Sequence, residues 1–353
     1  MKEASQYRVV FFGLGEIGTR ALRMALGCRG ISVVGAIDTN QELVGKDLGT
    51  IAGLSRATGV AVSDNAVDVL IQSCPDAVIH TTNSLIEEVK PQISTVISAG
   101  VNCISSAEEM FHPRPDTYDH FMELHEEALA KNVSILGTGV NPGYVMDSLP
   151  LFLAKVCEAV HSVKVERIVD ASTRRFPLQR KVGMGLHPDE FIDLVKRNKM
   201  GHRGLIESMY SLAHGFGWNL DRVDEEVEPV LAQSRIETEF FTVEPGMTMG
   251  MKHRGYGMQN GKRVISLDLQ MYVKPEQVYD RIVMDGVPSI DTTLKGGVPG
   301  DSATASILIH SVPSVMECKP GFINLGRMPF IHSMFSLTSD MCGNDLNTLH
   351  LQS

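Results

Sequence analysis

The pattern of hydrophobic and polar positions changes its period repeatedly over the first 140 residues. An apolar run at 8–12 is followed by apolar positions at helical spacing over 17–26, and the same order recurs up to "VSILGTG". Strands that alternate with amphipathic helices are typical of a doubly wound parallel sheet. We therefore predict an α/β fold with a Rossmann domain over residues 1–147.

After about residue 160 the pattern becomes one of strands and long turns. Strand signals dominate from Arg235 to Val273, and Asn260-Gly261 between two of them is a strong hairpin signal. This predicts a second α+β domain, 148–299, with a large, mostly antiparallel sheet laid over a cofactor. The helical stretch from Gly300 opens a segment, 300–353, that we expect to return to the Rossmann domain. A twin subunit would cover the open face of such a sheet, so we expect a homodimer.

Composition narrows the possible partners. The net charge of -10 argues against nucleic acid or an anionic membrane, and no apolar run approaches the ~18 residues that a membrane span needs. The chain reaches a strand almost at once, so we expect no signal peptide. Six scattered cysteines without a CxxC pair favour a reduced cytoplasm and provide no metal site. We predict a cytoplasmic protein that acts on small molecules.

The first turn after the first strand carries a GxGxxG motif, formed by Gly13, Gly15 and Gly18. In such a motif the first glycine permits a tight turn, the second lets a pyrophosphate approach the backbone, and the third allows close packing of helix on strand. The phosphates then meet the positive end of the helix. The predicted phosphate-binding residues are Gly13, Leu14, Gly15, Glu16, Ile17 and Gly18.

An acid, Asp38, ends the second predicted strand. A carboxylate there accepts hydrogen bonds from the ribose hydroxyls and repels a 2′-phosphate, so it favours NAD over NADP. The alternative is an ordinary turn residue at a strand end. Lys46 lies too far along the chain to assign, so use of NADP stays open.

Two further loops follow predicted strands. Thr81, Thr82 and Asn83 would pass beneath the ribose and nicotinamide, although Asn83 or Ser84 could also cap the next helix. In "GTGVNPGY", Asn141 is expected as an N-cap with Pro142 as the first helical residue. That placement would let Asn141 hold the nicotinamide carboxamide.

Two adjacent carboxylates, Glu108 and Glu109, follow the strand that ends at Ser105. Alcohol oxidation usually uses a lysine, tyrosine or histidine, and the lysine that sugar dehydrogenases place here is missing. A glutamate suits an amine, because it can hold the ammonium, take its proton and then activate water. The alternative is a solvated helix start, where acids are favoured.

The order and spacing of many motifs resemble those of the 2,4-diaminopentanoate dehydrogenases and their relatives, the native amine dehydrogenases. These motifs include "GLGEIG", "VGAID", "TTNS", "SAEEM", "LGTGVNPGYVMD", "GHRGLIES" and "KGGVPGDSATA". The resemblance implies a dihydrodipicolinate reductase-like N-terminal domain, NAD(P)H, a homodimer and a catalytic glutamate, for which we favour Glu108 with Glu109 as the alternative. It implies reversible deamination of a primary amine to a ketone or aldehyde and ammonia. The implied pocket residues are Tyr144, Arg167, Arg174, His202 and Thr304.

Two features depart from the relatives' pattern or stay without a role. The stretch "ASTRRFPLQRK" is unusually basic and could receive a carboxylate of the substrate, and the tail "TSDMCGNDLNTLHLQS" has no assigned function. Two alternatives remain for the whole chain: an imine or enoyl reductase of the dihydrodipicolinate type, which would not need ammonia, and a non-enzymatic NAD-binding sensor.

Overall fold

The computed structural model describes residues 7–172 and 176–323. The chain divides into two compact units. Among the described residues, the first unit consists of residues 7–140 and 299–323, and the second unit consists of residues 141–172 and 176–298.

The first unit is built on a seven-stranded sheet in the order β15-β6-β5-β4-β1-β2-β3. All of its described strand pairs are parallel. This confirms the predicted doubly wound sheet. The strands are β1 (Tyr7–Phe12), β2 (Ile31–Ile37), β3 (Val62–Ser63), β4 (Ala77–His80), β5 (Asn102–Ser105), β6 (Ser134–Gly137) and β15 (Gly321–Phe322).

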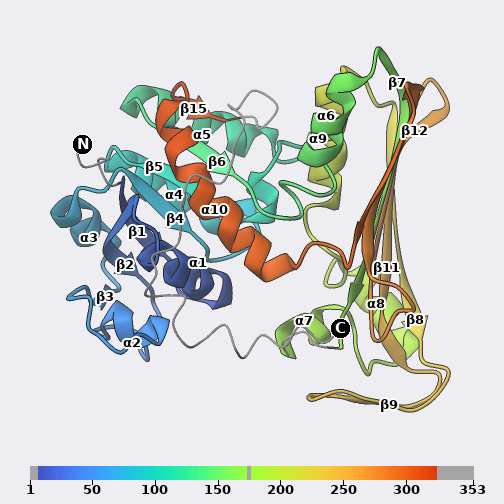
Figure 1. Ribbon diagram of the computed structural model, residues 1–353, viewed down its shortest axis with the longest axis horizontal. Coiled ribbons are helices and arrows are strands. Elements are labelled where there is room, and N and C mark those ends of the chain that lie inside the picture. The colour runs from blue at the N-terminus through green and yellow to red at the C-terminus, as the bar shows by residue number, and fades with distance from the viewer. Residues whose placement is uncertain (1–6, 173–175, 324–353) are drawn as a thin grey trace. The chain divides into compact units, whose positions relative to one another are not determined.

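Helices cover both faces of this sheet, because its strands are apolar on both sides. On one face α1 and α10 pack against Val9, Phe11 and Ile79, and on the other α3, α4 and α5 pack against Val10, Val78 and Cys103. Figure 1 shows α10 crossing the sheet beside α1. The helices are α1 (Glu16–Leu26), α2 (Leu48–Ala52), α3 (Ala66–Ser73), α4 (Ile86–Ser98), α5 (Tyr118–Lys131) and α10 (Gly300–Glu317), with a 3-10 turn η1 (Glu108–Met110).

The strand order reverses beside β1, which lies between β2 and β4. Ligands of open α/β sheets bind where the order reverses, outside the carboxyl ends of the strands. The glycine loop follows β1, the loop with Thr81 follows β4, and η1 follows β5. The fold therefore gathers the segments expected to bind cofactor at one edge.

The second unit contains a six-stranded sheet in the order β14-β13-β7-β12-β11-β8. Its strand pairs are antiparallel except for β7 with β12, which confirms the mostly antiparallel sheet. The predicted hairpin joins β11 to β12, and Asn260 and Gly261 at its turn have φ of 51° and 72°. The strands are β7 (Ala159–Asp170), β8 (Arg222–Leu231), β11 (Thr248–Gln259), β12 (Lys262–Tyr272), β13 (Tyr279–Val287) and β14 (Ile290–Lys295), with a separate pair β9 (Ile236–Glu237) and β10 (Thr242–Val243).

The two faces of this sheet differ in what they carry. Helix α9 packs on β11 and β12, where Met209 lies over Gly255. Since side chains alternate along a strand, Arg254 and Tyr256 lie on the opposite face. That opposite face also bears Ile168 of β7. The helices of this unit are α6 (Ser148–Leu153), α7 (Phe176–Lys181), α8 (Pro188–Lys196) and α9 (Leu205–Phe216), with a 3-10 turn η2 (Ala154–Val156).

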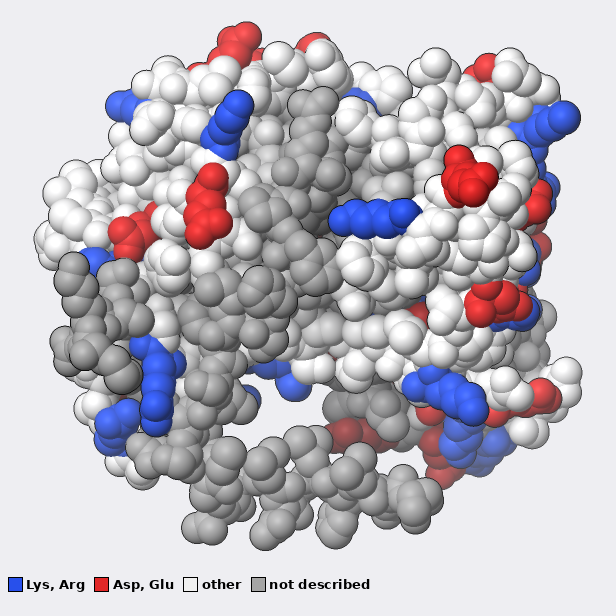
Figure 2. All heavy atoms as spheres, turned by 45° about the horizontal axis from the view of Figure 1, so that its top comes forward, with Lys and Arg blue, Asp and Glu red and all other residues white. Residues whose placement is uncertain are grey.

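Charged side chains of both signs are interspersed among the described residues on the face shown in Figure 2. Exposed ion pairs among the described residues include Arg222 with Asp224 and Arg281 with Asp291. Such pairs contribute little to stability, typically ~0–1 kcal/mol. Within the described ranges, no helix has the length and apolar character required to cross a membrane.

Candidate active site

The glycine loop after β1 forms a tight cradle that side chains would fill. Gly13 has φ of +96°, and a Cβ on it would lie 2.6 Å from the carbonyl oxygen of Thr81. A Cβ on Gly18 would overlap the carbonyl oxygen of Gly13, whereas Gly15 faces open space. The Thr81 hydroxyl donates to that same Gly13 oxygen at 2.7 Å. The Thr81 hydroxyl therefore holds the loop at Gly13, and the backbone is open at Gly15, which a pyrophosphate would approach.

Helix α1 begins directly after this loop, with Gly15 as N-cap and no side-chain hydrogen bond at the cap. The carboxylate of Asp38, at the end of β2, accepts hydrogen bonds from the backbone N–H of Leu14 at 2.6 Å and of Asn40 at 2.8 Å. Asp38 thus stabilises the turn at its own strand end, as the alternative interpretation held. The same contacts place its negative charge beside the glycine loop.

The loop after β4 differs from the expectation in one respect. The N-cap of α4 is Leu85, and neither Asn83 nor Ser84 caps the helix with its side chain. The alternative interpretation, capping by Asn83 or Ser84, is wrong because Glu109 of η1 supplies the acceptor: its Oε2 lies 3.0 Å from the backbone nitrogen of Ile86. In the same loop, the Thr82 hydroxyl donates to Oε1 of Gln92 at 2.6 Å.

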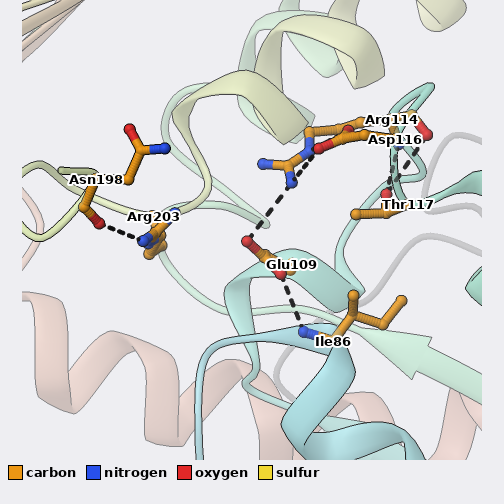
Figure 3. Close-up of polar contacts among 7 residues, drawn as sticks. All are labelled: Ile86, Glu109, Arg114, Asp116, Thr117, Asn198 and Arg203. Atoms are coloured by element: carbon orange, nitrogen blue, oxygen red, sulfur yellow. Dashed lines mark hydrogen bonds and ion pairs between the residues drawn. The ribbon is translucent and has the colours of Figure 1, made fainter. Parts of the chain in front are cut away.

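The two glutamates of η1 have different surroundings. Glu109 is 6% exposed, its backbone N–H donates to Ser84, and its second carboxylate oxygen lies 3.6 Å from the Arg114 guanidinium (Figure 3). Glu108 is half-buried on the same turn. A Cβ on Gly137 of β6 would overlap the Met110 carbonyl oxygen, so the turn lies close against the sheet. The Glu109 carboxylate therefore contacts the start of α4 with one oxygen and Arg114 with the other.

In the second unit, the expected helix start at Pro142 is wrong. Residues 141–147 form turns, and α6 begins at Ser148 with Asp147 as its cap. The buried Asp147 carboxylate accepts hydrogen bonds from the N–H of Ser148, the N–H of Gly143 and the Ser208 hydroxyl. Burial raises the pKa of Asp147. Asp147 therefore takes the capping role predicted for Asn141.

Asn141 and His202 are joined by a hydrogen bond. His202 Nε2 lies 3.1 Å from the Asn141 carbonyl oxygen, and burial lowers the pKa of His202 to about 3, with Lys181 nearby contributing. The neutral ring therefore donates from Nε2 and keeps Nδ1 as an acceptor. The side-chain oxygen of Asn141 is buried and has no hydrogen-bond partner among the described residues. Such an orphaned acceptor suits an amide N–H of a ligand.

The loop that carries His202 is fixed at several points. The backbone N–H of His202 donates to Nδ1 of His253 at 3.0 Å, and Nε2 of His253 lies 2.6 Å from the Glu225 carboxylate. Arg203 donates to the carbonyl oxygen of Asn198, which closes the loop before α9 (Figure 3). These contacts hold His202 in one orientation.

The remaining predicted pocket residues have varied placements. Tyr144 is 39% exposed and lies within the turns of residues 141–147. Thr304, in α10 of the first unit, accepts a hydrogen bond from the N–H of Val140 at 3.2 Å and so holds the segment after β6. Arg174 lies outside the described residues.

Arg167 is placed unlike a residue that lines a substrate pocket. It is 3% exposed, and one of its nitrogens lies 2.8 Å from both carboxylate oxygens of Asp280. Another nitrogen of the Arg167 guanidinium donates to the carbonyl oxygen of Val298. This buried pair joins β7 to β13, so Arg167 has a structural role in the sheet.

Sequence reasoning missed a buried pair at the ends of β4 and β5. His80 and Ser105 are the last residues of these strands, and His80 Nδ1 lies 2.9 Å from the Ser105 hydroxyl. The available signal was a polar residue at the end of each apolar run, directly before a predicted cofactor loop and the glutamate pair. No group of three or more His, Cys, Asp or Glu in the described ranges could hold a metal ion.

Comparisons with known proteins agree with this architecture. The family model described as "2,4-diaminopentanoate dehydrogenase C-terminal domain" matches residues 144–344, and that described as "Dihydrodipicolinate reductase, N-terminus" matches residues 7–107. The 2,4-diaminopentanoate dehydrogenase of Acetoanaerobium sticklandii is 28% identical over 329 residues, which cover 91% of this chain and 93% of the relative.

Two amine dehydrogenases are also similar. That of Streptomyces virginiae is 22% identical over 348 residues, covering 91% of this chain and 95% of the relative. The structure of amine dehydrogenase from Mycobacterium smegmatis shares the fold, with a TM-score of 0.83 at 23% identity over 94% of this chain and 98% of the other. The model of the 2,4-diaminopentanoate dehydrogenase C-terminal domain spans more than half of the chain, and the protein therefore belongs to the 2,4-diaminopentanoate dehydrogenase family.

Proposed function

We propose that the protein is an NAD(P)-dependent amine dehydrogenase, which converts a primary amine to a ketone or aldehyde and ammonia, and catalyses the reverse amination. The observation that carries this proposal is the division of roles in η1. Glu109 is committed to the start of α4 and to Arg114, and its neighbour Glu108 remains half-buried at the end of β5. A carboxylate at that strand end fits the proton transfers of amine chemistry.

The described residues fit a nicotinamide dinucleotide. The glycine cradle and the start of α1 would hold the pyrophosphate, and Asp38 would lie toward the ribose, since its carboxylate is fixed beside Leu14. The orphaned side-chain oxygen of Asn141 would accept from the carboxamide. When bound, the cofactor accepts a hydride in deamination and supplies one in amination. We propose NAD as the preferred cofactor, because the charge of Asp38 disfavours a 2′-phosphate.

Glu108 would manage the protons at the reacting carbon. In deamination its carboxylate accepts a proton from the bound ammonium, which leaves a neutral amine able to lose hydride. After the hydride has left, it releases that proton to solvent, and it then accepts a proton from the water that attacks the iminium carbon. It returns this proton to the nitrogen, which leaves as ammonia. In the reverse direction it protonates the hydroxyl that leaves as water. A single positioned carboxylate can serve all of these steps because they occur on the same nitrogen and carbon.

We propose that His202 and Tyr144 contact the substrate. The neutral ring of His202 presents Nδ1 as an acceptor, and the partly exposed Tyr144 ring offers an apolar wall. Thr304 would hold the segment after β6 in place through its bond to Val140. These are groups for a small cationic or polar substrate with an apolar part.

We also propose a homodimer formed through the face of the six-stranded sheet that bears Ile168, Arg254 and Tyr256. Apolar and aromatic side chains are mixed there with paired charges: Arg254 lies 2.9 Å from Glu228 and 3.7 Å from Asp268. A twin subunit is a self-complementary cover for such a face. The scattered cysteines of the sequence favour the cytoplasm as the compartment.

Turnover tests the proposal directly. Purified protein is incubated with a panel of primary amines and NAD or NADP at alkaline pH, and with ketones or aldehydes, ammonia and the reduced cofactor. Amine-dependent NADH formation is expected, and Glu108→Gln should lower it by roughly 100- to 10,000-fold with the cofactor dissociation constant unchanged. Glu87→Gln, an exposed change on α4, is the matched control and should leave turnover intact.

The alternatives give different results in the same assay. A reductase of the dihydrodipicolinate type, whose N-terminal model matches residues 7–107, would oxidise the reduced cofactor without ammonia. A sensor would bind cofactor and turn over no substrate. Either outcome, or full activity in Glu108→Gln, would reject the mechanism proposed for Glu108.

A further inference from the structure

A buried network of polar side chains joins the two loops that the proposed chemistry needs. His80, the last residue of β4, is fully buried, and its Nδ1 lies 2.9 Å from the hydroxyl of Ser105, the last residue of β5. On its other side Nε2 lies 2.7 Å from Oε1 of Gln92 in α4. Neither contact belongs to the sheet ladder or to the proposed proton transfers.

The chemistry of the groups fixes the direction of each bond. Burial lowers the pKa of His80 to about 4, so the ring is neutral at physiological pH and carries one proton. Oε1 of Gln92 can only accept, so that proton is on Nε2 and Nδ1 is an acceptor. The Ser105 hydroxyl must then donate to Nδ1, while its oxygen accepts the backbone N–H of Ala107 at 3.1 Å.

The two ends of this network lie in functional loops. Ala107 immediately precedes Glu108, the proposed catalytic base. At the other end, Thr82 of the proposed cofactor loop donates to Gln92 at 2.6 Å and lies 3.0 Å from His80 Nε2. The bonds therefore run without interruption from Ala107, through Ser105, His80 and Gln92, to Thr82.

We infer that His80 and Ser105 are positioning residues, which fix the backbone before Glu108 in register with the Thr82 loop so that the carboxylate meets the amine. The inference rests on the proposed function of Glu108 and goes beyond it. Each bond of the network has a defined donor and acceptor, so a shift of either loop would leave a polar group without its partner. Glu109 holds the other side of η1 through Ser84 and Ile86, so the turn is tied at two points.

Ser105→Ala is the first test, because it removes the acceptor of Ala107 and the donor to His80 without adding bulk. We expect kcat to fall by roughly 10- to 100-fold, the loss typical of a displaced catalytic group, with the NAD dissociation constant changed less than about 2-fold. Ser105→Thr, which keeps the hydroxyl, should recover most of the turnover. Amide hydrogen exchange without substrate should become faster over residues 106–110 and stay unchanged in α10.

A double-mutant cycle with Glu108→Gln separates positioning from general damage. If Ser105 acts through Glu108, Ser105→Ala should cause no further loss in the Glu108→Gln background. Suppose that Glu108→Gln is strongly impaired and that the double variant loses turnover by the product of the two single losses. That result would overturn the positioning role and leave the proposed function standing. Full turnover in Glu108→Gln would instead reject the proposed function, and the inference with it.

Gln92→Leu provides a second route if Ser105→Ala fails to fold. Gln92 is half-buried on α4, and its loss removes the acceptor of both His80 and Thr82. The same lowered kcat and the same absence of further loss with Glu108→Gln are expected. A Gln92→Leu protein with unchanged kcat would overturn the inference.

Discussion

The carboxylate of Glu109 accepts a hydrogen bond from the backbone N–H of Ile86 at 3.0 Å, so a residue of the turn after β5 stabilises the first turn of the helix after β4. The two residues lie on neighbouring strand-to-helix connections of the parallel sheet. This contact separates two glutamates that are adjacent in the sequence and chemically identical. We propose Glu108, the half-buried neighbour of Glu109, as the base.

Glu109→Gln is expected to cost stability rather than activity. The amide keeps an oxygen for Ile86 but removes the negative charge from the start of α4 and from Arg114, so we expect a loss of about 1 kcal/mol. Urea unfolding and amine turnover measured on the same preparation check this. If Glu109→Gln instead abolishes turnover while Glu108→Gln is active, the two roles are exchanged.

Asp38 should control the choice between NAD and NADP. Asp38→Ala removes the charge that repels a 2′-phosphate, so the ratio of the NADP to the NAD dissociation constant should fall. Asp38 also accepts hydrogen bonds from the backbone N–H groups of Leu14 and Asn40, so Asp38→Ala could disturb the loop. Asp38→Asn is the matched variant, because it keeps an acceptor for the loop and loses only the charge, and the ratio should fall in it as well. Titration of both cofactors into both variants is the measurement, and an unchanged ratio in both would remove Asp38 from the ribose site.

Arg167 and Arg235 offer a comparison between a buried and an exposed ion pair. Arg167→Ala leaves the buried Asp280 carboxylate without its partner, and we expect a loss of roughly 3–5 kcal/mol. Arg235 pairs with Glu237, and their side chains are 60% and 68% exposed, so Arg235→Ala should cost no more than about 1 kcal/mol. Unfolding by urea ranks the two, and equal losses would contradict the structural role of Arg167.

Two buried histidines should make stability depend on pH. The pKa of His80 is lowered to about 4 and that of His202 to about 3, mainly by burial. The ordinary pKa of histidine is ~6.5. Between that pH and the lowered pKa of each buried histidine, the unfolded chain binds a proton that the folded protein does not. The unfolding free energy should therefore fall as the pH falls, by about 1.4 kcal/mol per pH unit for each histidine.

Urea midpoints at pH 7 and pH 5 test this dependence. His80→Asn should reduce the difference between the two midpoints, whereas the same change at exposed His161 should leave it as in the parent protein. A pH dependence that persists unchanged in His80→Asn would show that other groups are responsible.

The proposed dimer predicts a mass twice that of the 38.6 kDa chain. Ile168→Asp places an unpaired charge in the middle of the proposed interface, between β12 and β13, and should shift the protein toward monomer. Ile192→Asp, on the partly exposed surface of α8, is the control and should leave the mass unchanged. Sedimentation velocity at micromolar concentration measures both, and a monomeric parent protein would reject the dimer.

Local features of this protein followed from its sequence. The glycine loop, the alternation of strands and helices in the first unit, and the hairpin at Asn260-Gly261 each depend on the conformations available to a few neighbouring residues. Backbone freedom at glycine and the spacing of apolar positions decide such features within a short window, and this is why the pattern predicted them.

Other features depended on partners that are distant in the chain, and only the tertiary structure decided them. Asp147 caps α6 in place of Asn141 with the help of Ser208 from another helix, and Arg167 meets Asp280 across 113 positions of sequence. The separation of Glu109 from Glu108 depends on Ile86, 23 positions away. A buried carboxylate or guanidinium is stable only where it is paired, and the partner is supplied by whichever segment the fold brings alongside. Residue type and spacing could therefore predict an acid pair at this strand end, while the fold alone determined which acid faces inward.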